Sequence, residues 1–314
     1  MGRVIMTRFI ASAAATAVFV VLVALPAGAR ATPIDTARIP AEADGVGHVD
    51  MDALRRTQLH RLLAPKLMVH VNSGHENPAS RNLVKALIDS VQSVSFWITK
   101  NDAGAVLVQV PDARRIQALL DKLPRRGPIK VAGVNVYRYS LDGKAPHPKD
   151  DDDSLIALVG NTFILSDDTT SLAKAINAAS RRGPTLASTR AVVDGALERG
   201  VFFFTSLNAK MLDKVKDAAQ SQTLRINMSG LTVNVGEVNA QVRVKVKLTM
   251  GTPQEAQQIK SMVEGVLALV SMSDEAAEVR PLAKTLKVTT VGKAVEMNAS
   301  MGAAELVKLI ESKK

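Results

Sequence analysis

The chain of 314 residues is 46% hydrophobic, which is typical of a protein with a buried core rather than a disordered one. It has no cysteine, which excludes disulfides, thiolate metal sites and a cysteine nucleophile, and its 3% of aromatic residues argues against exposed stacking platforms for nucleic acid or sugars. The formal net charge of +10 indicates either a soluble basic surface or contact with anionic envelope polymers or lipid headgroups.

The first thirty-one residues have the three-part pattern of a secretory signal peptide. Arg3 and Arg8 form a short basic region, an uncharged run follows at 9–25, and small residues offer cleavage after Ala29 or Ala31. The two arginines are not adjacent and no cysteine follows, which favours a Sec-type signal without lipid attachment. We therefore predict a periplasmic or extracellular protein with no stable transmembrane span after cleavage. The alternative is a signal retained as an anchor, although its run is short for a span.

Four copies of one plan follow along the chain: strand, tight turn, strand and amphipathic helix. The paired strands are predicted at 94–100 with 105–110, 155–159 with 162–166, 231–235 with 241–250, and 286–291 with 294–301. In each following helix the apolar residues recur at i, i+3, i+4 and i+7, so one side should pack on the hairpin. These stripes are Ile116, Leu119, Leu120, Leu123; Leu172, Ala175, Ile176, Ala179; Ile259, Met262, Val263, Val266; and Ala303, Leu306, Val307, Ile310. Because hairpins imply antiparallel pairing, we predict an α+β fold of antiparallel sheets with helices on one face.

A larger repeat encloses these units. Residues 49–54 and 203–208 each form a short strand that runs into a helix, and each is followed by two hairpin–helix units. This order predicts two similar α+β halves. The predicted segments are a signal peptide at 1–31, a flexible N-terminal segment at 32–44, the first half at 45–182, a helical linker at 183–199 and the second half at 200–314.

Several polar residues have the spacing of helix starts. Thr252 and Glu255 flank Pro253 as in a capping box, in which each side chain bonds to the backbone of the other residue. Asp50 and Asp168 precede predicted helices, where a carboxylate accepts hydrogen bonds from free backbone N–H groups. These acids therefore have a structural role, and we do not assign them to catalysis.

No motif in the chain predicts catalysis or a resident metal. His70, His75 and Glu76 have the order His-x4-His-Glu within a polar segment, which is not the helical spacing of a metalloprotease. The acidic run 150–153 lacks the alternation and glycine of a calcium loop, so a solvated loop is the better interpretation. A nucleophile elbow and a phosphate-binding glycine loop are also missing. We therefore predict a non-enzymatic protein with no catalytic residue, metal or cofactor.

One strand predicts a binding surface. Between 241 and 248, Arg243, Lys245 and Lys247 alternate with valines, so they share the wet side of a sheet. They could bind an anionic envelope polymer or lipid headgroups, or they could serve only to keep sheets from associating. A second hypothesis is a carrier of lipid or another apolar ligand, in which the methionine-bearing helix at 259–272 lines a pocket instead of simply packing in the core. We expect no nucleic acid partner.

The order of these features resembles exported bacterial proteins of unknown function with tandem hairpin–helix (ββα) units. The features that carry the resemblance are the signal peptide, the strand leading into 49–54, the hairpin–helix units and the Gly-Pro-Thr-Leu-Ala-Ser segment at 183–188. The resemblance implies a secreted or envelope location. It implies no activity and no functional residues.

Overall fold

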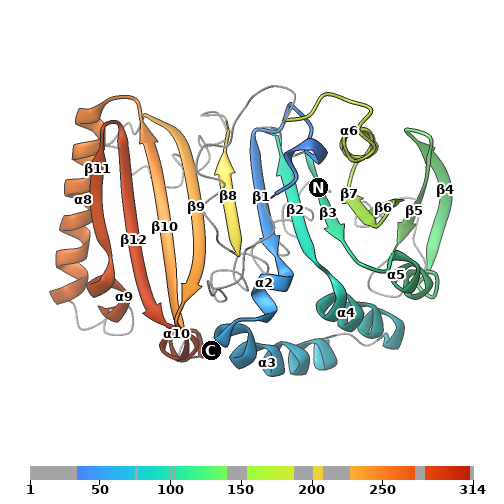
Figure 1. Ribbon diagram of the computed structural model, residues 1–314, viewed down its shortest axis with the longest axis horizontal. Helices are drawn as coiled ribbons and strands as arrows, with labels where there is room; N and C mark the ends of the chain where they lie inside the picture. The colour runs from blue at the N-terminus through green and yellow to red at the C-terminus, as the bar shows by residue number, and fades with distance from the viewer. Residues whose placement is uncertain are drawn as a thin grey trace.

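The computed structural model describes residues 34–74, 77–99, 101, 103–139, 154–186, 201–207, 227–272 and 280–311. Within these ranges, twelve strands form one antiparallel sheet (Figure 1), in the order β11-β12-β10-β9-β8-β1-β2-β3-β7-β6-β5-β4. The strands are β1 (Gly45–Asp50), β2 (Ser93–Ile98), β3 (Gly104–Gln109), β4 (Arg125–Val131), β5 (Val134–Tyr139), β6 (Ser154–Val159), β7 (Thr162–Ser166), β8 (Phe202–Ser206), β9 (Met228–Val238), β10 (Gln241–Met250), β11 (Lys287–Val291) and β12 (Ala294–Gly302). The predicted α+β class is confirmed.

The two predicted halves meet at the middle of this sheet. Strand β1 pairs antiparallel with β8, and the sheet grows outward from each of them by the same plan. One side runs β1-β2-β3-β7-β6 and the other runs β8-β9-β10-β12-β11. In both directions the first strand is followed by one hairpin and then by a second hairpin whose later strand lies nearer the centre of the sheet. The halves therefore share one hydrogen-bonded sheet.

The sequence prediction missed the hairpin of β4 and β5, which extends the first side of the sheet. Its signal was present in the alternating valines and tyrosines at 134–139. The strands join at Ala132 and Gly133, whose φ angles of 48° and 81° make a tight reversal that glycine adopts easily. This hairpin matters for function because it forms one wall of a cavity described below.

The described α-helices are α2 (Met51–Arg55), α3 (Gln58–Gly74), α4 (Pro78–Ser90), α5 (Ala113–Leu120), α6 (Thr169–Ala179), α8 (Pro253–Met272), α9 (Arg280–Thr285) and α10 (Ala303–Glu311). Helices α2, α3, α4, α5, α8 and α10 cover one face of the sheet, as predicted, whereas α6 packs on the other face. The reason lies in the first half, whose strands are apolar on both sides. Trp97 and Ile164 pack with α6, while the adjacent Phe96 and Phe163 belong to the clusters on the opposite face.

The segment before β1, expected to be flexible, is packed from Ile34 onward. It contains the short 3-10 helix η1 (Thr36–Arg38), and Ile39 is fully buried in the same cluster as α6. The Ala41 N–H donates to the Pro184 carbonyl at 3.1 Å, which ties this segment to the chain that follows α6.

The predicted helix starts are confirmed. The carboxylates of Asp50 and Asp168 accept hydrogen bonds from backbone N–H groups three residues later, each at 2.7 Å. At the start of α8, the Glu255 N–H donates to the Thr252 hydroxyl at 3.2 Å and the Thr252 N–H donates to the Glu255 carboxylate at 2.9 Å. This reciprocal pair is the capping box that the spacing predicts.

Candidate binding surfaces

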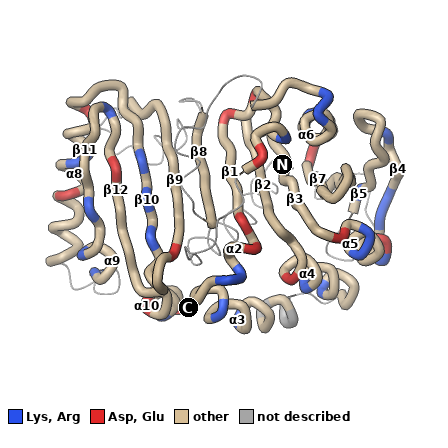
Figure 2. The backbone as a smooth tube through the Cα atoms, in the orientation of Figure 1, with Lys and Arg blue, Asp and Glu red and all other residues tan. Residues whose placement is uncertain are grey.

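The basic strand face consists of Arg243, Lys245 and Lys247 on β10. All three point away from the valines that pack under α8 and α10, so the predicted alternation is correct. Arg243 and Lys247 are exposed, whereas the ammonium of Lys245 lies 4.0 Å from the carboxylate of Glu296 on β12. Figure 2 shows the basic positions along β10. Its role in binding stays a prediction.

The C-terminal half of α8 exposes a continuous row of apolar side chains. Only Ala256 and Ile259 of this helix are buried, against strands β10, β11 and β12. The side chains of the exposed row, here called the α8 ridge, are Met262 (40% exposed), Val266 (53%), Leu269 (69%) and Met272 (83%). The prediction that Met262 and Val266 belong to the buried stripe is therefore wrong. Apolar residues occupy more than one side of this helix, and the sheet covers only the side that faces it.

Two exposed cations lie on elements that contact α8. Lys284 on α9 and Lys287 at the start of β11 are exposed, and α8 contacts both elements. Neither lysine forms an ion pair with another described residue. On α8 itself Lys260 pairs with Glu264 at 2.8 Å, and Glu255 in the first turn leaves the helix with one more negative than positive charge. Lys287 pairs across the strands with Asn298, which pairs in turn with Lys245, so the Lys287 side chain points to the sheet face opposite α8. Of the two lysines, only Lys284 can therefore add positive charge on the side of the α8 ridge.

A buried carboxylate links the two halves. Glu237, at the end of β9, is only 2% exposed; its carboxylate receives hydrogen bonds from the N–H groups of Leu59 and Gln58 at the start of α3, while its Oε2 atom has no partner among the described residues. Burial raises its pKa, although these hydrogen bonds and the charge of Arg61 oppose the rise. Nearby, burial and the positive charge of Arg55 lower the pKa of His60.

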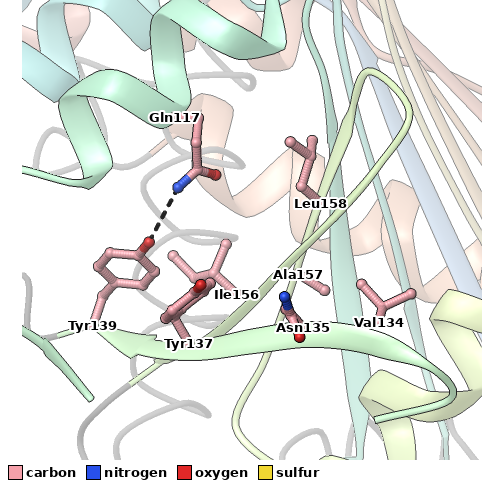
Figure 3. Close-up of a pocket in the computed structure, with 8 residues that line it drawn as sticks. All are labelled: Gln117, Val134, Asn135, Tyr137, Tyr139, Ile156, Ala157 and Leu158. Atoms are coloured by element: carbon pink, nitrogen blue, oxygen red, sulfur yellow. Dashed lines mark hydrogen bonds between the residues drawn. The ribbon is translucent and has the colours of Figure 1, made fainter. Parts of the chain in front are cut away.

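A small cavity lies between α5 and the hairpin formed by β5 and β6 (Figure 3). Its volume is about 270 Å³, and none of its lining residues is charged. The lining residues are Gln117, Val134, Asn135, Tyr137, Tyr139, Ile156, Ala157 and Leu158. The amide nitrogen of Gln117 donates to the Tyr139 hydroxyl at 3.4 Å and to the Asp121 carboxylate at 2.8 Å. The guanidinium carbon of Arg125 lies 4.5 Å from the centre of the Tyr137 ring.

A groove of about 420 Å³ runs between α4 and α5. Three cations line it, Lys85, Arg115 and Lys122, together with the carboxylate of Asp89. No sequence pattern predicts this groove, because its residues come from α4 and from α5 and the turn after it, which only tertiary packing brings together.

The residues considered for metal binding are not brought together. Among the described parts of the chain, no group of three or more histidine, aspartate or glutamate residues is placed to hold a metal ion. His70 lies in α3, so the segment from 71 to 74 is helical rather than the expected loop. His75, Glu76 and the acidic run 150–153 lie outside the described residues, as do the cleavage positions Ala29 and Ala31.

Where the structure describes helices, none is both long enough and apolar enough to cross a membrane.

No family model matches this chain, and no curated protein matches it. Among solved structures, it is similar to TP0453 of Treponema pallidum in three crystal forms. Forms I and III match at 11% identity and a TM-score of 0.49, covering 90% of this chain and 99% and 98% of TP0453. Form IV matches at 9% identity and a TM-score of 0.49, covering 89% of this chain and 97% of TP0453. The resemblance is one of architecture, and no functional conclusion rests on it.

Proposed function

We propose that this chain is an exported, non-enzymatic protein that binds peripherally to the surface of an anionic lipid membrane through α8. The observation that supports the proposal is the α8 ridge, in which Met262, Val266, Leu269 and Met272 follow one another along one side of the helix and are 40–83% exposed. Single exposed apolar residues are ordinary on protein surfaces, but a contiguous row of them is typical of an interaction site.

The dimensions of the ridge suit an interfacial helix. From Met262 to Met272 an α-helix rises about 15 Å, long enough to lie along a membrane surface and too short to cross it. Helices that lie in the interface bury their apolar side to a depth of about 5–10 Å at the boundary of headgroups and acyl chains. The ridge is on the outer edge of the sheet, where α8 runs beside β11 (Figure 1). Lipid can therefore approach it without any change in the fold.

The charge beside the ridge favours anionic headgroups. Lys284 is exposed on α9, which contacts α8, and a lysine held near an anionic membrane contributes about 1 kcal/mol. The surplus of basic residues, +10 over the whole chain, adds a longer-range attraction that salt weakens. The signal peptide predicted at 1–31 would bring the protein to an envelope membrane from the outside.

The arrangement of α8 favours a membrane surface over the alternative of an internal lipid carrier. A carrier needs apolar side chains that converge on an enclosed space. The ridge side chains instead face solvent, and neither of the two cavities described above is lined by α8. Co-purified lipid in native mass spectrometry would revive the carrier hypothesis.

Flotation with lipid vesicles tests the proposal. The processed protein from its own host would be mixed with vesicles of phosphatidylcholine alone or with added phosphatidylglycerol. We expect flotation with the anionic vesicles, weaker flotation with the neutral ones, and a decrease as salt rises. Lys284→Glu should reduce binding to anionic vesicles and leave binding to neutral vesicles unchanged. If the protein stays in the unbound fraction with both vesicle types at low salt, the proposal is wrong.

A further inference from the structure

The cavity between α5 and the paired strands β5 and β6 brings together the only two tyrosines of the chain. Tyr137 and Tyr139 are on the same side of β5, with ring centres 6.2 Å apart and planes tilted by 55°. Apolar side chains of β6, among them Ile156 and Leu158, line the cavity beside them (Figure 3). The low aromatic content of the sequence argued against ring-based recognition, but tertiary structure concentrates the tyrosines at one place.

The polar groups at this cavity have hydrogen-bonding capacity left over. The Tyr139 hydroxyl accepts from the Gln117 amide at 3.4 Å, and Arg125 also hydrogen bonds to it. Because Tyr139 is only 1% exposed, these contacts fix its ring in the wall of the cavity, and ligand hydrogen bonds fall to the other polar groups. The carbonyl oxygen of Gln117 points away from Tyr139 in Figure 3 and can accept. Asn135 at the rim adds an amide with both a donor and an acceptor.

The cavity is also electrically neutral. None of the eight residues that line it is charged, and two charged groups that contact lining residues, Arg125 and Asp121, are paired with each other. A charged ligand would lose its hydration here without gaining an opposite charge, which disfavours anions and cations alike. Its volume of about 270 Å³ is slightly below the usual range for small-molecule sites, about 300–1,000 Å³. It therefore suits one small ring rather than an extended ligand.

We propose that this cavity binds one ring of a neutral sugar. A sugar ring has apolar C–H faces that can lie against Tyr137, Ile156 and Leu158, and hydroxyls that both donate and accept. Those hydroxyls match the acceptor of Gln117 and the mixed amide of Asn135. This site is separate from the α8 ridge, which lies at the opposite edge of the sheet (Figure 1).

The two tyrosines make the proposal testable by NMR. In the processed protein labelled with ¹³C at tyrosine, each ring gives its own signals, since the chain has two tyrosines. We expect saturable shifts of both sets of signals with methyl β-glucopyranoside, with a dissociation constant on the order of 1 mM. Methyl β-glucuronide differs only in carrying a carboxylate, and it should bind at least about tenfold more weakly because the lining is uncharged.

A rim substitution and a matched control complete the experiment. Asn135→Ala should weaken binding of methyl β-glucopyranoside about fivefold or more, which is the loss of one hydrogen bond, without changing the unfolding midpoint. Asn82→Ala, at an exposed asparagine on α4 outside the cavity, should leave binding unchanged. The proposal is overturned by linear, unsaturable shifts, by equal binding of the two glycosides, or by an Asn135→Ala variant that binds normally. Vesicle flotation does not depend on Asn135, so failure here leaves the proposed membrane role untouched.

Discussion

Replacing the two most exposed side chains of the α8 ridge, Leu269→Gln with Met272→Gln, should weaken membrane binding sharply and leave the fold intact. Leu269 and Met272 are 69% and 83% exposed. Full burial of such a side chain is worth about 1.5–3 kcal/mol. We take the burial free energy of each side chain as about 2 kcal/mol and multiply it by the fraction that is exposed. The transfer of both side chains into lipid then contributes up to about 3 kcal/mol. Since about 1.4 kcal/mol corresponds to a factor of ten, the double variant should bind vesicles roughly a hundredfold more weakly.

The assay is flotation across a series of lipid concentrations, with thermal unfolding of each variant in the absence of lipid. Val69→Gln is the matched control, because Val69 on α3 is 68% exposed but lies outside the α8 ridge. We expect it to bind as the unsubstituted protein does. Exposed substitutions change stability by about 0.5 kcal/mol or less, so the unfolding midpoints should agree closely. Equal binding by the double variant and the Val69→Gln control would refute the assignment of the α8 ridge to the membrane.

Three further substitutions test other parts of the structure. Arg243→Glu with Lys247→Glu should abolish any salt-dependent binding to anionic polymers by the basic strand face, and unchanged binding would exclude this face. Glu237→Gln should raise the unfolding midpoint, and the increase should be largest at pH 8. Burial raises the pKa of Glu237 in the folded state, so ionisation of this carboxyl destabilises the fold as pH rises. The increase in midpoint should shrink below the ordinary pKa of a glutamate, about 4.3. A gain that is independent of pH would show that charge is not the cause. Asp168→Ala removes the cap on the Ser171 N–H and should cost about 1 kcal/mol in chemical denaturation, which Asp168→Asn should largely restore.

Local features of the fold could be predicted because they depend on residues close together in sequence. The capping box at Thr252 and Glu255 and the cap at Asp168 each need only a three-residue spacing, and both have the expected hydrogen bonds. Hairpins joined by tight turns can be predicted in the same way, since strand alternation and a glycine turn are local signals. The β4–β5 hairpin shows the limit of this approach: its alternation was present at 134–139 but was not recognised as a separate unit.

The candidate sites depended on contacts between distant segments. Periodicity alone put Met262 and Val266 in the core, but a helix can be apolar on more sides than its sheet can cover, and only packing shows which side remains exposed. Similarly, Tyr137 and Gln117 are twenty residues apart and belong to different elements, so no spacing rule places them at one cavity.

The sequence by itself determined the α+β class, the antiparallel hairpins, the helix starts and the alternation that puts Arg243 and Lys247 on one strand face. These follow from backbone hydrogen bonding and side-chain periodicity, which act over a few residues. Tertiary structure alone decided that β1 and β8 join both halves in one sheet, that α6 covers the opposite face, and that the α8 ridge stays exposed. Burial is a property of the whole assembled surface, so the pattern within a single segment cannot determine it.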